Sequence, residues 1–116
     1  MYKTRERLQN IYLKISYIED IVNESGNITK SLNDEKKSRP AILMHLASIA
    51  EQFDKLSKAG EFDILNEFDK RDLKGTYDVR NYIVHDYEGI NLSIIENIIR
   101  YKLPEMKKIL EILLKN

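Results

Sequence analysis

The sequence contains no cysteine, no tryptophan, two prolines and four glycines among its 116 residues. The absence of cysteine excludes disulfide bonds and catalysis by a thiolate, and it is compatible with a reducing cytoplasm. Long apolar runs are also missing, since no window approaches the roughly 20 residues that a helix needs to span a bilayer. The amino terminus runs into charged residues rather than into a secretion signal. We therefore expect a cytoplasmic protein with no membrane partner.

An excess of charge of either sign is missing as well. The 19 Lys and Arg residues balance the 19 Asp and Glu residues, so the formal net charge is zero. This balance counts against binding of nucleic acid through a strong overall field. Binding of RNA would need a local basic patch, for which Lys70, Arg71, Lys74 and Arg80 on one predicted helix are the candidates. The alternative is that the cations from Lys70 to Lys74 form a solvated helix start.

The sequence is rich in helical periodicity. With 42% hydrophobic and 33% charged residues and few helix breakers, residues 1–116 are expected to form one helix-rich globular domain. Apolar residues at steps of three and four predict an amphipathic helix over residues 4–24. A second apolar seam predicts a bundle helix over residues 41–58.

Helix starts and breaks can be placed from single residues. Ser38 is predicted to cap the second long helix, with Pro40 in its first turn. Asn91 or Ser93 is predicted to cap a last helical segment of more than 20 residues with a wide apolar face. Pro104 should bend or divide that segment, because proline removes a backbone donor from a helix interior.

A third long helix is predicted over residues 70–87, with Asp69 as its cap. Gly75 lies within this helix, where it either lets a neighbouring backbone approach closely or marks a break. Shorter helices are possible near residues 28–36 or 61–68. The expected fold is therefore all-α, an up-and-down bundle of four main helices with one or two short ones.

The carboxyl-terminal half of the third helix carries the sequence Arg80-Asn81-Tyr82-Ile83-Val84-His85-Asp86-Tyr87. Asn81 and His85 lie four residues apart and share one helix face. A histidine exchanges protons near neutral pH, and a guanidinium group holds a phosphate through a planar fork. The set suggests phosphodiester chemistry, with His85 as general acid or base and Arg80 stabilising charge on phosphorus. No second histidine or carboxylate is placed to complete a zinc site with His85, so no metal site is expected.

These residue types also have an ordinary interpretation, as a solvated arginine and a half-buried histidine. The five steps from Arg80 to His85 turn the two side chains about 140° apart, which is awkward for a site within one chain. A complete site is easier to build where two copies of the helix meet across a two-fold axis. The spacing therefore favours a homodimer.

The pattern Arg80-x4-His85-x-Tyr87, with Asn81 after the arginine, resembles the motif of the HepT toxin family, a minimal branch of the HEPN domain ribonucleases. The resemblance covers nearly the whole chain, because residues 41–51 are similar to the family's second long helix and residues 102–106 to its last. The chain departs from the family where Ala50-Glu51 replaces a common Gly-Glu pair, and it lacks a Pro-Trp pair before the motif. Those departures concern packing more than chemistry.

The resemblance implies an all-helical HEPN fold and an endoribonuclease that acts as the toxin of a type VII toxin–antitoxin system, without metal or cofactor. Arg80, Asn81 and His85 would be its catalytic residues, RNA its substrate and a homodimer its assembly. A nucleotidyltransferase antitoxin similar to MntA would neutralise it by adding AMP groups to Tyr87, an AMPylation.

Two other hypotheses stay open at this point. In the first, the chain is a non-catalytic HEPN-type module that binds nucleotide or substrate and docks a nucleotidyltransferase. In the second, it is a helical dimer whose polar cluster only satisfies an interface. His45 is a possible second catalytic residue, but a structural imidazole is expected because no matching motif surrounds it. Glu51, at the acidic position of the Gly-Glu pair, is expected to give structural support.

Overall fold

The structure, a computed structural model, describes residues 2–115, with the backbone alone at position 2. Nearly all of this part of the chain is helical, and it contains no strand. Four long helical elements form the bundle: α1 (Tyr2–Ser25), α3 (Ser38–Lys58), α5 (Lys70–His85) and a last element that begins with α6 (Leu92–Asn97). The all-α bundle predicted from the sequence is confirmed.

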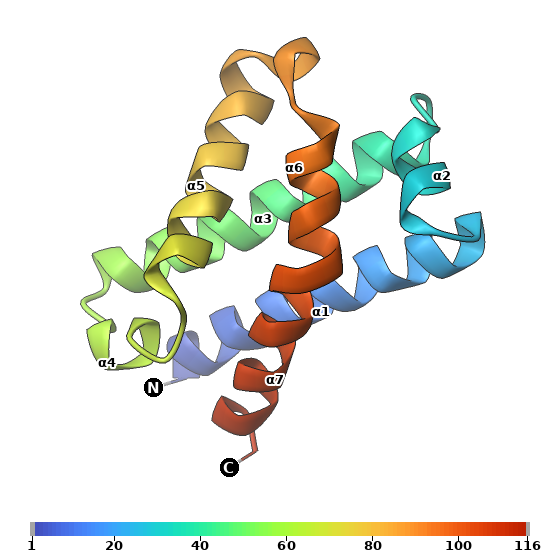
Figure 1. The fold of residues 1–116 in the computed structure, drawn as a ribbon. Helices are drawn as coiled ribbons and strands as arrows, with labels where there is room; N and C mark the ends of the chain where they lie inside the picture. The colour runs from blue at the N-terminus through green and yellow to red at the C-terminus, as the bar shows by residue number, and fades with distance from the viewer. Residues whose placement is uncertain (1, 116) are drawn as a thin grey trace.

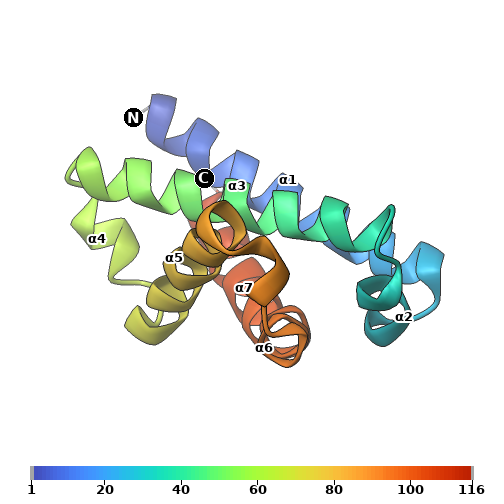
Figure 2. The ribbon, with the colours of Figure 1, turned by 90° about the horizontal axis from the view of Figure 1, so that it is seen from above.

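The helices are arranged around α3 (Figures 1 and 2). The long helices α1 and α3 lie side by side, and α5 packs against α3 on the side away from α1. The carboxyl-terminal half of the last element packs against α1. The carboxyl-terminal end of α5 therefore projects beyond α3, which brings the motif to an open edge of the bundle.

The last element is divided in the middle, as Pro104 predicted. The helix α6 passes into a π-helical turn, η2 (Ile98–Lys102), which continues as α7 (Leu103–Leu113). Proline has no N–H to offer the carbonyl one turn before it, so the regular helical ladder is interrupted near this point. Asn91 is the residue that caps α6, because its side-chain oxygen accepts the N–H of Ser93 at 2.9 Å.

Both possible short helices form, as α2 (Ile28–Asn33) and α4 (Phe62–Leu65). The Asn27 side chain caps α2 by accepting the N–H of Lys30 at 2.8 Å. The segment that contains α4 is tethered to the bundle by the buried side chains of Leu65 and Phe68. The ring of Phe68 meets that of Phe53 edge to face, with 5.1 Å between the ring centroids.

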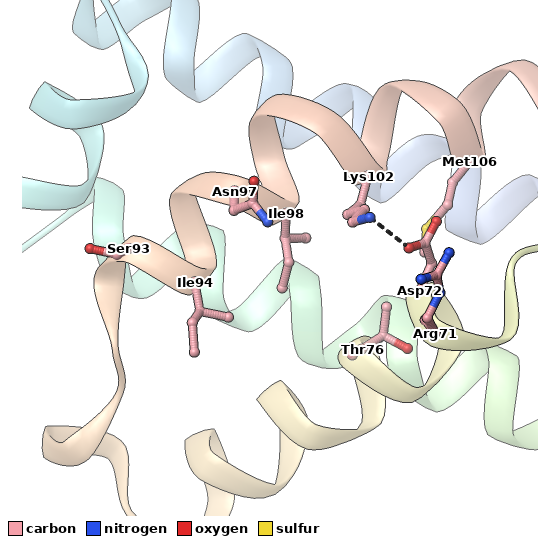
Figure 3. Close-up of a pocket in the computed structure, with 10 residues that line it drawn as sticks. Arg71, Asp72, Thr76, Ser93, Ile94, Asn97, Ile98, Lys102 and Met106 are labelled. Atoms are coloured by element: carbon pink, nitrogen blue, oxygen red, sulfur yellow. Dashed lines mark ion pairs between the residues drawn. The ribbon is translucent and has the colours of Figure 1, made fainter.

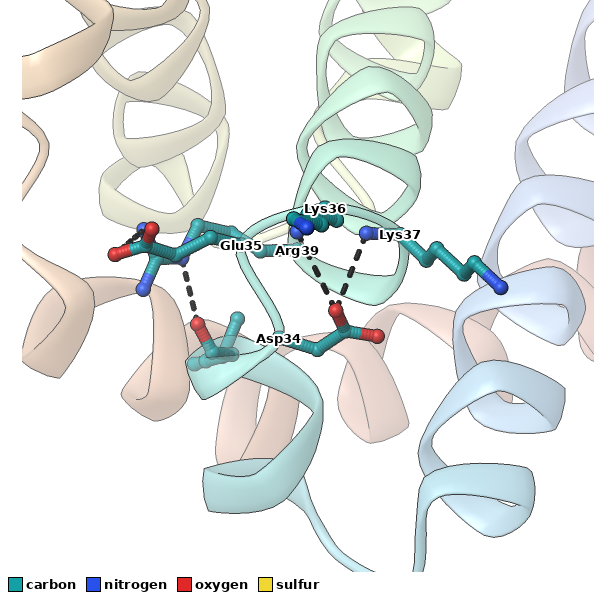
Figure 4. Close-up of polar contacts among 6 residues, drawn as sticks. Asp34, Glu35, Lys36, Lys37 and Arg39 are labelled. Carbon is teal, nitrogen blue, oxygen red and sulfur yellow. Dashed lines mark hydrogen bonds and ion pairs between the residues drawn. The ribbon is translucent and has the colours of Figure 1, made fainter.

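The start of α3 differs from the prediction. Ser38 is the first residue of the helix rather than its cap, and no side chain at the preceding Lys37 caps it. The Asp34 carboxylate does this from the loop, by accepting the N–H groups of Lys36 and Lys37 at 3.3 and 3.2 Å (Figure 4). It also accepts the N–H of Ser38 at 3.1 Å. These donors, the Ser38 backbone N–H first, hold the pKa of Asp34 below its ordinary value. Pro40 lies in the first turn, as predicted.

The buried core is aliphatic and lies between α1, α3 and the last element. Its fully buried side chains include Ile11, Ile15, Ile18, Ile42, Leu43, Ile49, Phe53, Leu56, Ile95, Leu103, Met106 and Leu110. The periodic residues that predicted the first two long helices supply most of this core, because their faces turn toward each other. No helix among residues 2–115 is long and apolar enough to cross a membrane.

Candidate functional site

The helix α5 carries the motif and is oriented by three buried residues, Leu73, Thr76 and Val79. Its start is capped as predicted, because the Asp69 side chain accepts the N–H of Arg71 at 2.7 Å. Since the buried face turns toward the bundle, the opposite face is left to solvent. Asn81 and His85 lie on that exposed face.

The helix ends two residues earlier than predicted, at His85. Asp86 leaves the helical conformation with φ −153° and ψ 64°, and Tyr87–Gly89 form a single 3₁₀ turn, η1. A side chain at position 89 would meet the Asp86 carboxylate, so a substitution of Gly89 would require the Asp86 side chain to move. Tyr87 is therefore presented from a turn, with 38% of its surface exposed, and not from the helix that carries His85.

Arg80 points away from the exposed face, toward α3. Its Nη2 lies 3.6 Å from Oε1 of Glu51, and the two side chains remain 40% and 52% exposed. An ion pair this exposed contributes little to stability, at most about 1 kcal/mol. Its consequence is geometric, because Glu51 holds the guanidinium at the edge between α5 and α3.

The structure does not join the motif residues into one cluster within the chain. Among the described residues, no side-chain hydrogen bond or ion pair links Arg80, Asn81, His85 and Tyr87 to one another. Arg80 faces α3, whereas Asn81 and His85 face solvent. One chain thus presents the Arg80 guanidinium and the His85 imidazole on different sides of α5.

Three of the four cations in the basic patch predicted on α5 are paired with carboxylates. Arg71 pairs with Asp69 at 3.4 Å, Lys74 pairs with Asp78 at 2.8 Å, and Arg80 pairs with Glu51. The carboxylates of the cap residue Asp69, of Asp78 one turn further along α5 and of Glu51 on α3 thus partly neutralise these three cations. Lys70, the fourth cation of the predicted patch, forms no ion pair with a described residue.

A groove between α5 and the last element was not predicted. One part has a cavity volume of about 460 Å³, and the ion pair of Lys102 with Asp72 at 3.2 Å connects the two elements that line it (Figure 3). A second part, of about 530 Å³, reaches the motif's end at Tyr82 and Gly89. Gly75 lines both parts, and a Cβ added there would meet no atom within 4 Å. Gly75 therefore neither breaks the helix nor admits a neighbouring backbone.

His45 lies apart from the motif, on α3 facing α1. Its ring contacts that of Tyr17, with 5.3 Å between centroids, and burial together with the charge of Lys14 lowers the pKa of His45. A partly buried, neutral imidazole packed against an aromatic ring fits the structural role expected for it. No group of three or more His, Cys, Asp or Glu residues able to hold a metal occurs in the described part of the chain.

Comparison with known proteins gives a consistent result. A family model described as "Ribonuclease HepT-like" matches residues 6–113. The chain is also similar to "Putative RNase MJ0127" of Methanocaldococcus jannaschii, with 29% identity over 105 residues that cover 89% of this chain and 84% of that protein. A second protein of that organism, "Putative RNase MJ0125", is 27% identical over 107 residues, covering 91% and 89% of the two chains. No solved structure matches.

Proposed function

The chain belongs to the HepT-like ribonuclease family, and from that premise we propose that it is a metal-independent endoribonuclease acting as the toxin of a type VII toxin–antitoxin system. The observation that supports the proposal is that Arg80, Asn81 and His85 all lie in the last two turns of α5, with Asn81 and His85 exposed to solvent. The relatives named as RNases support the same class of activity.

The proposed reaction uses the RNA itself as nucleophile. The ribose 2′-oxygen attacks the adjacent phosphorus, its bond to phosphorus forms, and the bond from phosphorus to the 5′-oxygen breaks. The proton of the 2′-hydroxyl leaves to a base, and the departing 5′-oxygen gains a proton. His85 serves this proton transfer, Arg80 stabilises the charge on the phosphoryl oxygens, and Asn81 orients the imidazole or the phosphate. The products are a 2′,3′-cyclic phosphate and a 5′-hydroxyl, and the step requires no metal.

We propose that the working unit is a homodimer in which Arg80 of one copy meets His85 of the other. The separation of the two side chains on α5 supports this arrangement, because the guanidinium is held toward Glu51 while His85 faces outward. A two-fold contact would complete two equivalent sites.

Hybrid dimers test the shared site. Arg80→Ala and His85→Ala should each be inactive alone, and their co-expressed mixture should regain cleavage. If the site is shared, each hybrid dimer has one complete site and one inactive site. Random mixing makes about half of the dimers hybrids, so about a quarter of the wild-type rate is expected. A mixture that stays inactive, although both variants fold and dimerise, would show that each site lies within one chain.

Regulation is proposed to act on Tyr87, through AMPylation by a partner nucleotidyltransferase similar to MntA. The tyrosine is accessible in the η1 turn, two residues from His85. An attached adenylate would place negative charge and bulk beside the motif, where it would compete with RNA phosphate for Arg80. Modification at this position would therefore block the substrate without unfolding the bundle.

A further inference from the structure

A small hollow lies between the first turns of α1 and the carboxyl-terminal half of α3. It has a cavity volume of about 220 Å³ and is lined by Lys3, Glu6, Arg7, Asn10, Gln52 and Lys55. One water takes up roughly 30 Å³ in the liquid, so the hollow can admit a group of several heavy atoms.

The charges of this hollow are not neutralised within the chain. Three cations, Lys3, Arg7 and Lys55, face one carboxylate, that of Glu6, and none of the three forms an ion pair with a described residue. The other hollows differ, because their cations are paired with carboxylates, as Lys102 is with Asp72. The hollow therefore has a local positive charge, although the net charge of the whole chain is zero.

Gln52 adds an unsatisfied polar group to the same wall. Its side-chain Oε1 is the buried side-chain atom that lacks a hydrogen-bond partner in the described part of the chain. A buried acceptor without a donor costs free energy, and a ligand that supplies a donor relieves that cost.

The hollow and the ion pair of Arg80 with Glu51 share the helix α3. Gln52 follows Glu51, whose carboxylate holds Arg80, and Lys55 lies one helical turn beyond Glu51. We propose that this hollow binds a backbone phosphate of the RNA substrate, beyond the phosphate that is cleaved. The inference rests on the proposed ribonuclease function and adds a second contact point for the strand. Contacts of this kind fix the position of a nucleic acid and carry no sequence preference.

The test is binding of single-stranded RNA to the full chain, with His85→Ala in every protein so that the RNA stays intact. Adding Lys3→Gln, Arg7→Gln and Lys55→Gln should weaken binding at least about tenfold in low salt. The slope of log K against log salt should also fall by about 2, because three contacts to a single strand contribute about 0.7 each. Fluorescence anisotropy over a salt series measures both quantities.

The matched control removes three cations elsewhere. Lys30, Lys36 and Lys37 lie around α2 and likewise form no ion pair in the described structure. Their triple Gln variant changes the net charge equally and should leave the affinity and the slope nearly unchanged. Equal weakening by both triple variants would overturn the proposal, because the effect would then follow net charge alone. Displacement of the RNA by polyglutamate of matched charge would overturn it too, in favour of an acidic peptide.

Cleavage by the unmutated protein is measured in parallel. If the unmutated protein cuts RNA and the triple variant of the hollow binds RNA normally, the proposed subsite is wrong and the ribonuclease function stands. If the unmutated protein leaves RNA intact and only the triple variant of the hollow loses binding, the hollow binds RNA and the proposed ribonuclease function is wrong.

Discussion

The clearest prediction of a change in stability concerns Gly75, because this glycine lies in the middle of α5 and no neighbouring atom restricts a side chain there. An added Cβ meets no atom within 4 Å there, and the helix continues on both sides. Gly75→Ala should therefore stabilise the protein by about 0.5–1 kcal/mol, since alanine loses less backbone entropy on folding. For a chain of this length the midpoint of thermal unfolding should rise by roughly 2–6 °C. Urea denaturation followed by circular dichroism measures the change, with an unchanged m-value.

Gly60 provides the opposite control, since it also has nothing within 4 Å but adopts φ +78°. Gly60→Ala should destabilise by about 1–2 kcal/mol, because a left-handed backbone is unfavourable for a residue with a Cβ. Both glycines have space for a Cβ, so the difference between the two substitutions measures the effect of backbone conformation on stability. Destabilisation by Gly75→Ala would refute the reasoning, because it would mean that another group fills the groove above α5 in solution. A dependence of that loss on protein concentration would identify the group as a second copy.

Three further predictions follow from single side chains. Asp34→Asn should lower stability at neutral pH. The pKa of Asp34 is lower in the folded chain than in the unfolded chain. The Asp34 carboxylate therefore stabilises the fold above its ordinary pKa, and this stabilisation is lost as the pH falls through the lowered pKa. The urea midpoints of the wild type and Asp34→Asn should therefore converge in acid. His45 should titrate below about 6.5 by NMR, and His45→Gln should retain ribonuclease activity; loss of activity would give it a catalytic role. Tyr87→Phe should still cleave RNA but escape neutralisation by a co-expressed nucleotidyltransferase; loss of cleavage would place Tyr87 in the catalytic apparatus.

The fold was largely predictable, because periodic apolar residues and local caps encode helices directly. Asp69 caps α5 as predicted, and Asn91 is the one of the two predicted candidates that caps α6. The last element is divided near Pro104, as predicted. The misplaced cap of α3 has a local cause: the carboxylate that receives its N–H groups belongs to Asp34, in a loop without helical periodicity. The same limit applies to the end of α5, where the turn at Asp86 leaves no trace in the apolar pattern.

The site was predictable in its residue types and not in its arrangement. The side-chain spacing of Arg80 and His85 already placed them on different sides of a helix. The partner of Arg80 depends on how α5 crosses α3, and this crossing brings Glu51 within 3.6 Å. The groove beside Gly75 and the hollow beside Lys55 depend on the same packing of helices distant in sequence. Such features form between helices that are distant in sequence, so no local sequence pattern predicts them.

The ribonuclease account is tested most directly by inducing the wild-type chain and His85→Ala in cells that lack a nucleotidyltransferase partner. Growth and the ends of cellular RNA are followed, and circular dichroism of both purified proteins confirms folding. The account predicts growth arrest and new 5′-hydroxyl ends with the wild type alone, because His85 supplies the proton transfer. Normal growth and intact RNA with both folded proteins would contradict it and favour the non-catalytic binding module.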